Sequence, residues 1–196
     1  MGRWQPDACG RLQQAALDLY SERGFEQTTV ADIAARAGLT ERTFFRHFTD
    51  KREVLFSGSS ALLQLFVQTI AAAPPAATPL EAATAALHAA GTEFEQRREH
   101  ARLRRGVVSQ NAELQEREVS KLASLATAIA DALRGRGVAD PAAGLTAEIA
   151  VAIFKIAFER WVVQSTKREF VEFIDESLEE LAGLTADRPD IRRAKA

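Results

Sequence analysis

The sequence predicts an all-α protein of about nine helices, and three observations carry that prediction. First, 37 of the 196 residues are alanine, the residue with the highest helix propensity. Second, apolar residues recur at helical spacing in one segment after another, and we find no alternating strand pattern. Third, glycines and prolines separate these segments, as expected where helices end or begin. The composition, 46% hydrophobic and 27% charged, is globular.

The first two helices have clear start and stop signals. An apolar stripe at helical spacing covers residues 11–23 and ends at Gly24. Thr29, with Asp32 three residues later, forms the start signal known as a capping box. Gly38 ends this second helix, because glycine adopts the left-handed turn without strain.

A short third helix and a long fourth helix are expected next. Thr40 caps the third helix, and Asp50 with Glu53 opens the fourth. We expect the fourth helix to run without a break to about residue 73, where the proline-rich stretch 74–79 forms a linker.

The remainder of the chain is expected to be helical as well. Thr78, Pro79 and Glu81 together mark a helix start. The expected helices cover residues 79–97, 100–109, 111–133 and 141–164, with a last one from about 167. The predicted organisation is a flexible leader (1–10), a DNA-binding domain (11–55), a ligand-binding and dimerisation domain (56–186) and a flexible tail (187–196).

Charge and composition exclude several classes of function. The chain has one cysteine, and its three histidines (47, 88 and 100) lack the spacing of paired metal ligands. We therefore predict no catalytic residues, no metal site, no cofactor and no enzymatic activity. The N-terminus lacks a signal-peptide profile, and we expect no apolar stretch to approach the roughly 18 residues of a membrane span. A cytoplasmic protein without a membrane partner is predicted.

Residues 29–48 have the spacing of a helix-turn-helix. The net charge of the chain is −2, but residues 36–52 carry five basic and two acidic side chains. The outward face of the third helix is expected to present Arg42, Thr43, Arg46 and His47. Arginine can read guanine edges in the major groove, so this face favours DNA binding. The alternative is a helical hairpin whose charged face is merely solvated.

The stretch from Ala15 to Leu55 resembles the N-terminal domain of the TetR family of transcriptional regulators. The resemblance rests on Gly24-Phe25, Thr28-Thr29-Val30, Ile33-Ala34, Ala37-Gly38-Leu39-Thr40, Thr43-Phe44-Phe45, His47-Phe48 and Asp50-Lys51. It implies a homodimer that places the third helix of each protomer in the major groove of a double-stranded DNA operator.

The resemblance also implies individual DNA contacts. Arg42 and Arg46 would face base edges, and Thr29 and Lys51 would hold phosphates. The family usually has tyrosine at position 45, so Phe45 is expected to touch a thymine methyl or a sugar, or to lie partly in the core. The full predicted set is Thr29, Thr40, Arg42, Thr43, Phe45, Arg46, His47 and Lys51.

In the C-terminal part, the resemblance implies a pocket for a small-molecule effector and a dimer interface. The pocket candidates are Phe66, Leu87, His88, Phe94, Leu125, Phe154, Phe158 and Trp161; each could instead be ordinary core, and His88 a surface group. The dimer candidates are Ile149, Ile153, Ile156, Phe170, Ile174, Leu178 and Leu181; the alternative is a monomer core.

The predicted function is a homodimeric repressor that binds a palindromic operator and is released by a small, hydrophobic ligand. The alternatives are a ligand-independent regulator and an activator of the same fold. The basic run at 97–105 is expected to be a solvated helix face, or else to attract an acidic ligand.

Overall fold

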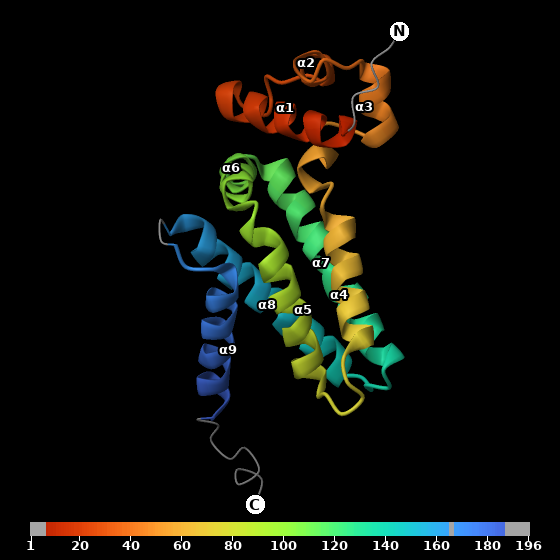
Figure 1. Cartoon of the computed structure of the whole chain (residues 1–196), viewed down its shortest axis with the longest axis vertical. Helices are drawn as coiled ribbons and strands as arrows, with labels where there is room; N and C mark the ends of the chain where they lie inside the picture. The colour runs from red at the N-terminus through yellow and green to blue at the C-terminus, as the bar shows by residue number, and fades with distance from the viewer. Residues whose placement is uncertain (1–6, 165–166, 187–196) are drawn as a thin grey trace, which may run out of the picture. The chain divides into compact units, whose positions relative to one another are not determined.

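The computed structural model describes residues 7–164 and 167–186, and within these ranges it confirms an all-helical fold of nine α-helices and one 3-10 helix (Figure 1). The predicted leader and tail lie largely outside the described residues. The elements are α1 (Ala8–Arg23), α2 (Val30–Arg36), α3 (Glu41–His47), η1 (Glu53–Phe56), α4 (Ser59–Ala72), α5 (Pro79–Glu95), α6 (Arg98–Ser109), α7 (Ala112–Gly135), α8 (Ala142–Val163) and α9 (Phe170–Ala186).

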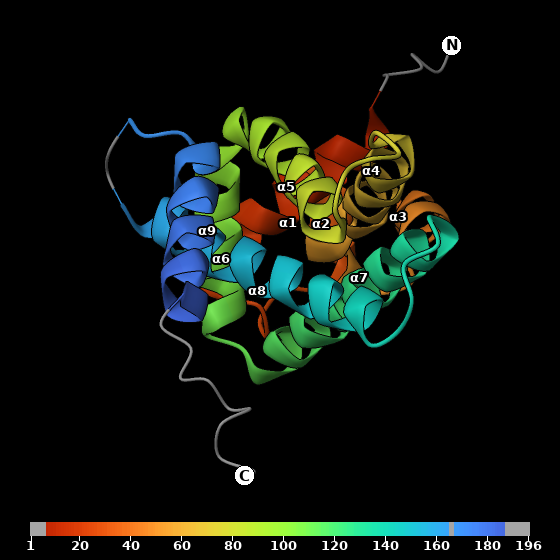
Figure 2. The same cartoon turned by 90° about the horizontal axis from the view of Figure 1, so that it is seen from below.

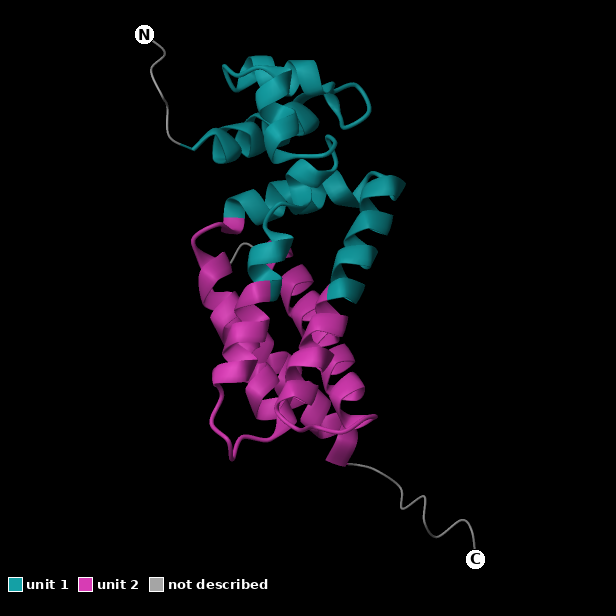
Figure 3. Cartoon of the chain, turned by 90° about the vertical axis from the view of Figure 1, so that its right-hand side faces the viewer, with its two compact units in different colours: residues 1–63, 99–124 teal, residues 64–98, 125–196 magenta. Residues whose placement is uncertain are grey.

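The chain folds into two compact units, which Figure 3 colours separately. Unit 1 comprises residues 1–63 and 99–124, and unit 2 comprises residues 64–98 and 125–196. The helices α4 and α7 each begin in unit 1 and continue into unit 2. The functional boundary expected at residue 55 stays a prediction.

Local capping determines where the helices of unit 1 begin and end. The Asp7 side chain accepts a hydrogen bond from the backbone N–H of Gly10 at the start of α1. The predicted capping box at Thr29 and Asp32 is present at the start of α2. Gly24 and Gly38 adopt positive φ angles of 89° and 64° after α1 and α2. Both stop signals therefore act as predicted.

The expected continuous fourth helix is wrong, because the chain forms η1 and then a separate helix, α4. Asp50 does cap this region, since its carboxylate accepts hydrogen bonds from the N–H groups of Arg52 and Glu53. The break falls at Ser57 and Gly58, directly before Ser59 begins α4, and glycine has low helix propensity.

One stretch, Glu53–Ala72, is long and apolar enough by length and composition to cross a membrane, so the expectation that no stretch reaches this length is wrong. The core helix of a globular protein passes the same test. Here Val54, Leu55 and Phe56 are buried in the core of unit 1, beside residues of α1. These three side chains therefore have a place in a globular core.

Unit 2 is built on the mutual packing of α5, α8 and α9 (Figure 2). The predicted capping box of Thr78 and Glu81, with Pro79 at the first helical position, opens α5. Gly91 allows close approach of α5 and α9, because a Cβ atom there would lie 2.9 Å from Val171 Cγ2. A larger residue at position 91 would require the side chains of Val171 and Ile174 to shift.

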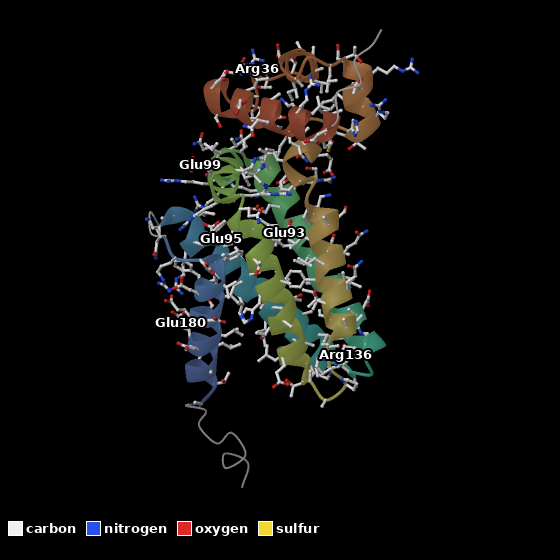
Figure 4. The ribbon with its side chains drawn as sticks, in the orientation of Figure 1. Arg36, Glu93, Glu95, Glu99, Arg136 and Glu180 are labelled. Atoms are coloured by element: carbon white, nitrogen blue, oxygen red, sulfur yellow. The ribbon has the colours of Figure 1, made fainter. Side chains whose placement is uncertain are left out.

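The end of α4 is capped by a distant arginine that the sequence pattern did not reveal. Arg136, labelled in Figure 4, donates to the carbonyl oxygens of Ile70, Ala73 and Pro74 at 3.1, 2.7 and 2.7 Å. The last carbonyl groups of a helix accept such donors readily, and a cation at a helix C-terminus also stabilises the helix dipole. Arg136 thus attaches the end of α4 to the end of α7 within unit 2.

Candidate nucleic-acid interface

The third helix, α3, is held in unit 1 by one face and exposed on the other. Phe44 is fully buried, and its ring centre lies 5.4 Å from that of Phe48. The Thr40 hydroxyl caps the helix by accepting a hydrogen bond from the N–H of Thr43 at 3.2 Å. This anchoring leaves the opposite face of α3 available to a partner.

The turn before α3 fixes the direction of that helix. Gly38 takes the left-handed conformation, and the N–H of Leu39 donates to the carbonyl of Ala34 at 2.8 Å. The Arg11 guanidinium donates to the carbonyl of Ala37. Sequence reasoning missed Arg11, because its partner is 26 residues away and no local pattern connects them.

The exposed face of α3 brings together most of the predicted DNA-binding residues. Arg42, Phe45, Arg46 and His47 are all exposed. Phe45 is 56% exposed, so the expectation that it lies partly in the core is not what the structure shows. Five of the predicted residues line one open depression: Thr40, Arg42, Thr43, Phe45 and Arg46.

The basic residues of segment 36–52 divide into two groups. Arg36, labelled in Figure 4, donates to the Glu22 carboxylate at 2.7 and 2.9 Å, which lowers the pKa of Glu22. Arg52 pairs with Asp50 at 3.1 Å. Within the described part of the chain, by contrast, Arg42 and Arg46 have no ion-pair partner. The positive charge available to a ligand therefore lies on α3.

Thr29 is exposed, but its hydroxyl already has a partner. The Oγ1 atom donates to Asp32 Oδ2 at 2.6 Å and accepts from the N–H of Asp32 at 3.2 Å. The hydrogen bonds from the Thr29 side chain and backbone lower the pKa of Asp32, whose carboxylate also pairs with Arg23 at 2.6 Å. A phosphate contact by the Thr29 hydroxyl would have to share or replace this capping bond.

Lys51 is used inside unit 1. Its Nζ atom donates to the carbonyls of Phe25 and Thr28 at 2.9 and 3.1 Å, and it lies 4.2 Å from the centre of the Phe25 ring. The Tyr20 hydroxyl donates to the carbonyl of Lys51 at 2.6 Å, and burial raises the pKa of Tyr20. Lys51 thus connects the start of η1 to the loop between α1 and α2.

We expect the variant Lys51→Met to be less stable, because it keeps the aliphatic stem and removes the ammonium group from its carbonyl partners. The free energy of unfolding should fall by about 1–3 kcal/mol, measured by urea denaturation. Arg52→Met is the matched control, since its exposed ion pair contributes about 1 kcal/mol or less. A Lys51→Met protein as stable as this control would contradict the structural role.

Two groups of acidic and basic side chains attach α6 and α7 to η1 within unit 1, and the sequence pattern did not reveal them. Arg104 donates to the carbonyl of Leu55 at 2.7 Å and to the Glu118 carboxylate at 2.9 Å. Glu53 accepts from Arg117 and Lys121. Arg104 belongs to the basic run 97–105, so at this position the expected solvated face is instead a tertiary contact.

The predicted pocket residues of unit 2 lie mainly in its core. Phe66, Leu87 and Trp161 are fully buried, and Leu125 and Phe154 nearly so, while Phe94 and Phe158 are partly exposed. His88 lies on α5, and its Nε2 atom is 2.6 Å from the Oδ1 atom of Asp175 on α9.

The predicted dimer residues divide between core and surface. Phe170 and Ile174 are fully buried and Ile153 is 4% exposed, so their side chains already pack within one protomer. Ile149, Leu178 and Leu181 are partly buried, and Ile156 is 51% exposed. Sequence reasoning missed three more exposed apolar side chains on the same two helices: Leu145, Val163 and Leu184.

Comparison with known proteins identifies the family. Residues 12–57 match the family described as "Bacterial regulatory proteins, tetR family". Residues 77–185 match the family described as "MftR C-terminal domain". The HTH-type transcriptional regulator TcmR of Streptomyces glaucescens is 38% identical over 79 residues, which are 40% of this chain and 35% of that protein. The chain thus matches about a third of the length of this relative.

Two solved structures share the fold. A TetR-family transcriptional regulator from Syntrophomonas wolfei aligns over 94% of this chain and 98% of its own, with a TM-score of 0.68 and 19% identity. Bacillus subtilis FadR, in complex with stearoyl-CoA, aligns over 88% of this chain and 96% of its own, with a TM-score of 0.61 and 18% identity. With an anchored helix-turn-helix and both parts of the chain matched, this protein belongs to the TetR family of DNA-binding transcriptional regulators, a family without enzymatic activity.

Proposed function

We propose that this regulator is a homodimeric repressor that binds a palindromic operator and is released by a small hydrophobic ligand. The observation that carries the proposal is the exposed face of α3, where two arginines with no ion-pair partner among the described residues flank an exposed phenylalanine. Arginine can bind guanine O6 and N7 with two hydrogen bonds, and an aromatic side chain can contact the methyl group of thymine.

The proposed DNA contacts follow from where each side chain lies. Arg42 and Arg46 would contact base edges, and Phe45 a thymine methyl or a sugar. Thr40, Thr43 and His47 would contact the backbone near these bases, since phosphate contacts fix the register of a protein on DNA. Thr29 and Lys51 would add phosphate contacts only by exchanging part of their present hydrogen bonding.

A dimer is proposed on the exposed apolar stripe of α8. Leu145, Ile156 and Val163 are 60, 51 and 60% exposed, and their spacing of 11 and 7 residues places them on one face of the helix. Leu184 on α9 is 81% exposed. Isolated apolar residues are common on surfaces, but an aligned set on one helix favours a partner helix of a second copy.

The ligand is proposed to act on the dimer through the separation of the two α3 helices. Half-sites in the major groove require a spacing of about 34–36 Å or a multiple of it. The effect of a ligand bound in unit 2 can pass to unit 1 through α4 and α7, since each of these helices has residues in both units. It shifts the equilibrium only by its differential affinity for the two states. The acyl-CoA in the B. subtilis FadR structure supports a hydrophobic ligand.

Selection of genomic DNA fragments with the purified protein at fixed salt tests the proposal, with Arg46→Ala as the matched control. Salt is fixed because phosphate contacts make affinity strongly salt-dependent. A short palindrome that the wild type enriches and the variant does not is the expected result. Genes beside it would direct the choice of ligands, and release of the operator by one of them would distinguish a ligand-responsive repressor from a ligand-independent regulator. No enrichment over the variant would contradict the proposal.

A further inference from the structure

Five aromatic rings form one cluster in unit 2. Phe94 comes from α5, Phe154, Phe158 and Trp161 from α8, and Phe170 from α9. Neighbouring ring centres are 5.0–6.1 Å apart, and Trp161 and Phe170 are stacked at 5.0 Å. These distances are those at which aromatic rings attract one another. The cluster is an apolar surface against which the ring of a ligand could pack.

The indole of Trp161 brings an unsatisfied hydrogen-bond donor into this cluster. Its side chain is fully buried, and its Nε1 atom has no hydrogen-bond partner among the described residues. A buried indole N–H normally finds an acceptor, because leaving it unmet costs the full desolvation of the group. The indole N–H can therefore donate to an acceptor that the described residues do not supply.

Two members of the cluster are partly exposed. Phe94 contacts three other rings of the cluster yet remains partly exposed, as does Phe158. Trp161 and Phe170, by contrast, are fully buried. A ring that packs on Phe158 would contact aromatic surface whose next member is the Trp161 indole, since the two ring centres are 6.0 Å apart.

Charged groups of both signs bind the backbone of cluster residues. The Arg98 guanidinium lies 5.2 Å from the centre of the Trp161 ring and donates to the carbonyls of Trp161, Gln164 and Arg168. The carboxylate of Glu95, labelled in Figure 4, accepts from the N–H of Phe170 at 2.9 Å. Both charged groups are already hydrogen-bonded to the backbone, and a neutral acceptor avoids the cost of burying a further charge beside the indole.

We propose that Trp161 is the polar anchor of the ligand site, and that the ligand is an apolar, ring-containing molecule with a neutral carbonyl oxygen. The aromatic side chains would pack against its rings, and the indole N–H would donate to its carbonyl. This inference rests on the proposed function, in which a small ligand binds in unit 2, and it names the chemical class of that ligand.

Matched ketone and hydrocarbon probes test the anchor. The pairs are benzophenone with diphenylmethane, and 9-fluorenone with fluorene, which differ mainly in the carbonyl group. The chain has two tryptophans, so a full-length Trp4→Phe variant leaves Trp161 as the sole indole signal in an ¹⁵N NMR spectrum. A ketone should shift the indole proton downfield and bind about fivefold or more tightly than its hydrocarbon, the gain of one hydrogen bond.

Two variants separate the hydrogen bond from general packing. Trp161→Phe should bring the affinity ratio of ketone to hydrocarbon to about 1, since it removes the donor and keeps a ring. Phe158→Leu should weaken both probes and leave the ratio unchanged. Equal affinity of the wild type for the two members of each pair, an unmoved indole signal, or no binding of either ketone would overturn the proposal.

The outcome is independent of DNA release. A ketone that binds through the indole but leaves the operator bound would support the anchor and count against a ligand-released repressor. Release of the operator by other compounds, with a ketone-to-hydrocarbon ratio of 1, would do the reverse.

Discussion

The double variant Arg42→Ala/Arg46→Ala is expected to bind the selected operator at least about 100-fold more weakly than the wild type, because each bidentate arginine–guanine contact contributes about 1–3 kcal/mol. A homodimer would lose these contacts in both half-sites, so this is the largest effect on DNA binding that we expect from two substitutions. The measurement is a titration of labelled operator at fixed salt.

Fold and general charge can be separated from this effect. Both arginines are exposed and have no ion-pair partner in the described part of the chain, so thermal unfolding of the double variant should match that of the wild type. Arg97→Ala is the matched control: its side chain is 70% exposed, and its substitution removes one positive charge from unit 2 and none from α3. Operator affinity of the double variant within about threefold of this control would rule out base contacts by α3.

Sequence predicted those parts of the fold that depend on neighbouring residues. Thr29 and Thr78 were identified as helix starts, because a capping box involves residues only three positions apart. The turn at Gly38 was identified for the same reason. The interruption of the fourth helix was not predicted. Whether the serine–glycine pair after Phe56 breaks the helix depends on how η1 packs in the core, and that packing involves distant residues.

Contacts between distant residues were the part that the sequence could not reveal. Arg136 at the end of α4, Lys51 under the α1–α2 loop and Arg104 on η1 all look like surface charges in a linear reading. Each reaches carbonyl groups at least 23 residues away. An arginine or lysine has the same local pattern whether its end is solvated or caps a distant helix.

The outward face of α8 was also beyond the sequence, for a different reason. The helix is apolar nearly all round, so its periodicity does not say which residues pack within the protomer. The structure separates Ile153 and Trp161, which are buried, from Ile156 and Val163, which are exposed. This separation moves the proposed dimer surface onto the second pair.

The double variant Ile156→Lys/Val163→Lys is accordingly expected to be a monomer. The two positions lie seven residues apart on one stripe of α8, and a twofold axis would bring each substitution into the interface twice. Four ammonium groups placed without partners in an apolar contact cost several kcal/mol, so the dissociation constant of the dimer should rise by about 100-fold or more.

Sedimentation equilibrium is the direct measurement, with a chain mass of 21.4 kDa for the variant and twice that value for the wild type. Val119→Lys is the matched control, because Val119 is 65% exposed on α7 and undergoes the same chemical change outside the proposed stripe of α8. Unfolding of each protomer should be little affected, since lysine is compatible with an exposed helical position.

Loss of the dimer should also weaken operator binding, since a single α3 contacts only one half-site and the phosphate contacts of the second protomer disappear. The variant then retains Arg42 and Arg46 but binds the palindrome no better than an isolated half-site. A variant that remains dimeric with unchanged operator affinity would place the interface elsewhere than on this stripe of α8. Dimer loss with unchanged operator affinity would instead show that one protomer suffices for recognition, and would count against the proposed palindromic repressor.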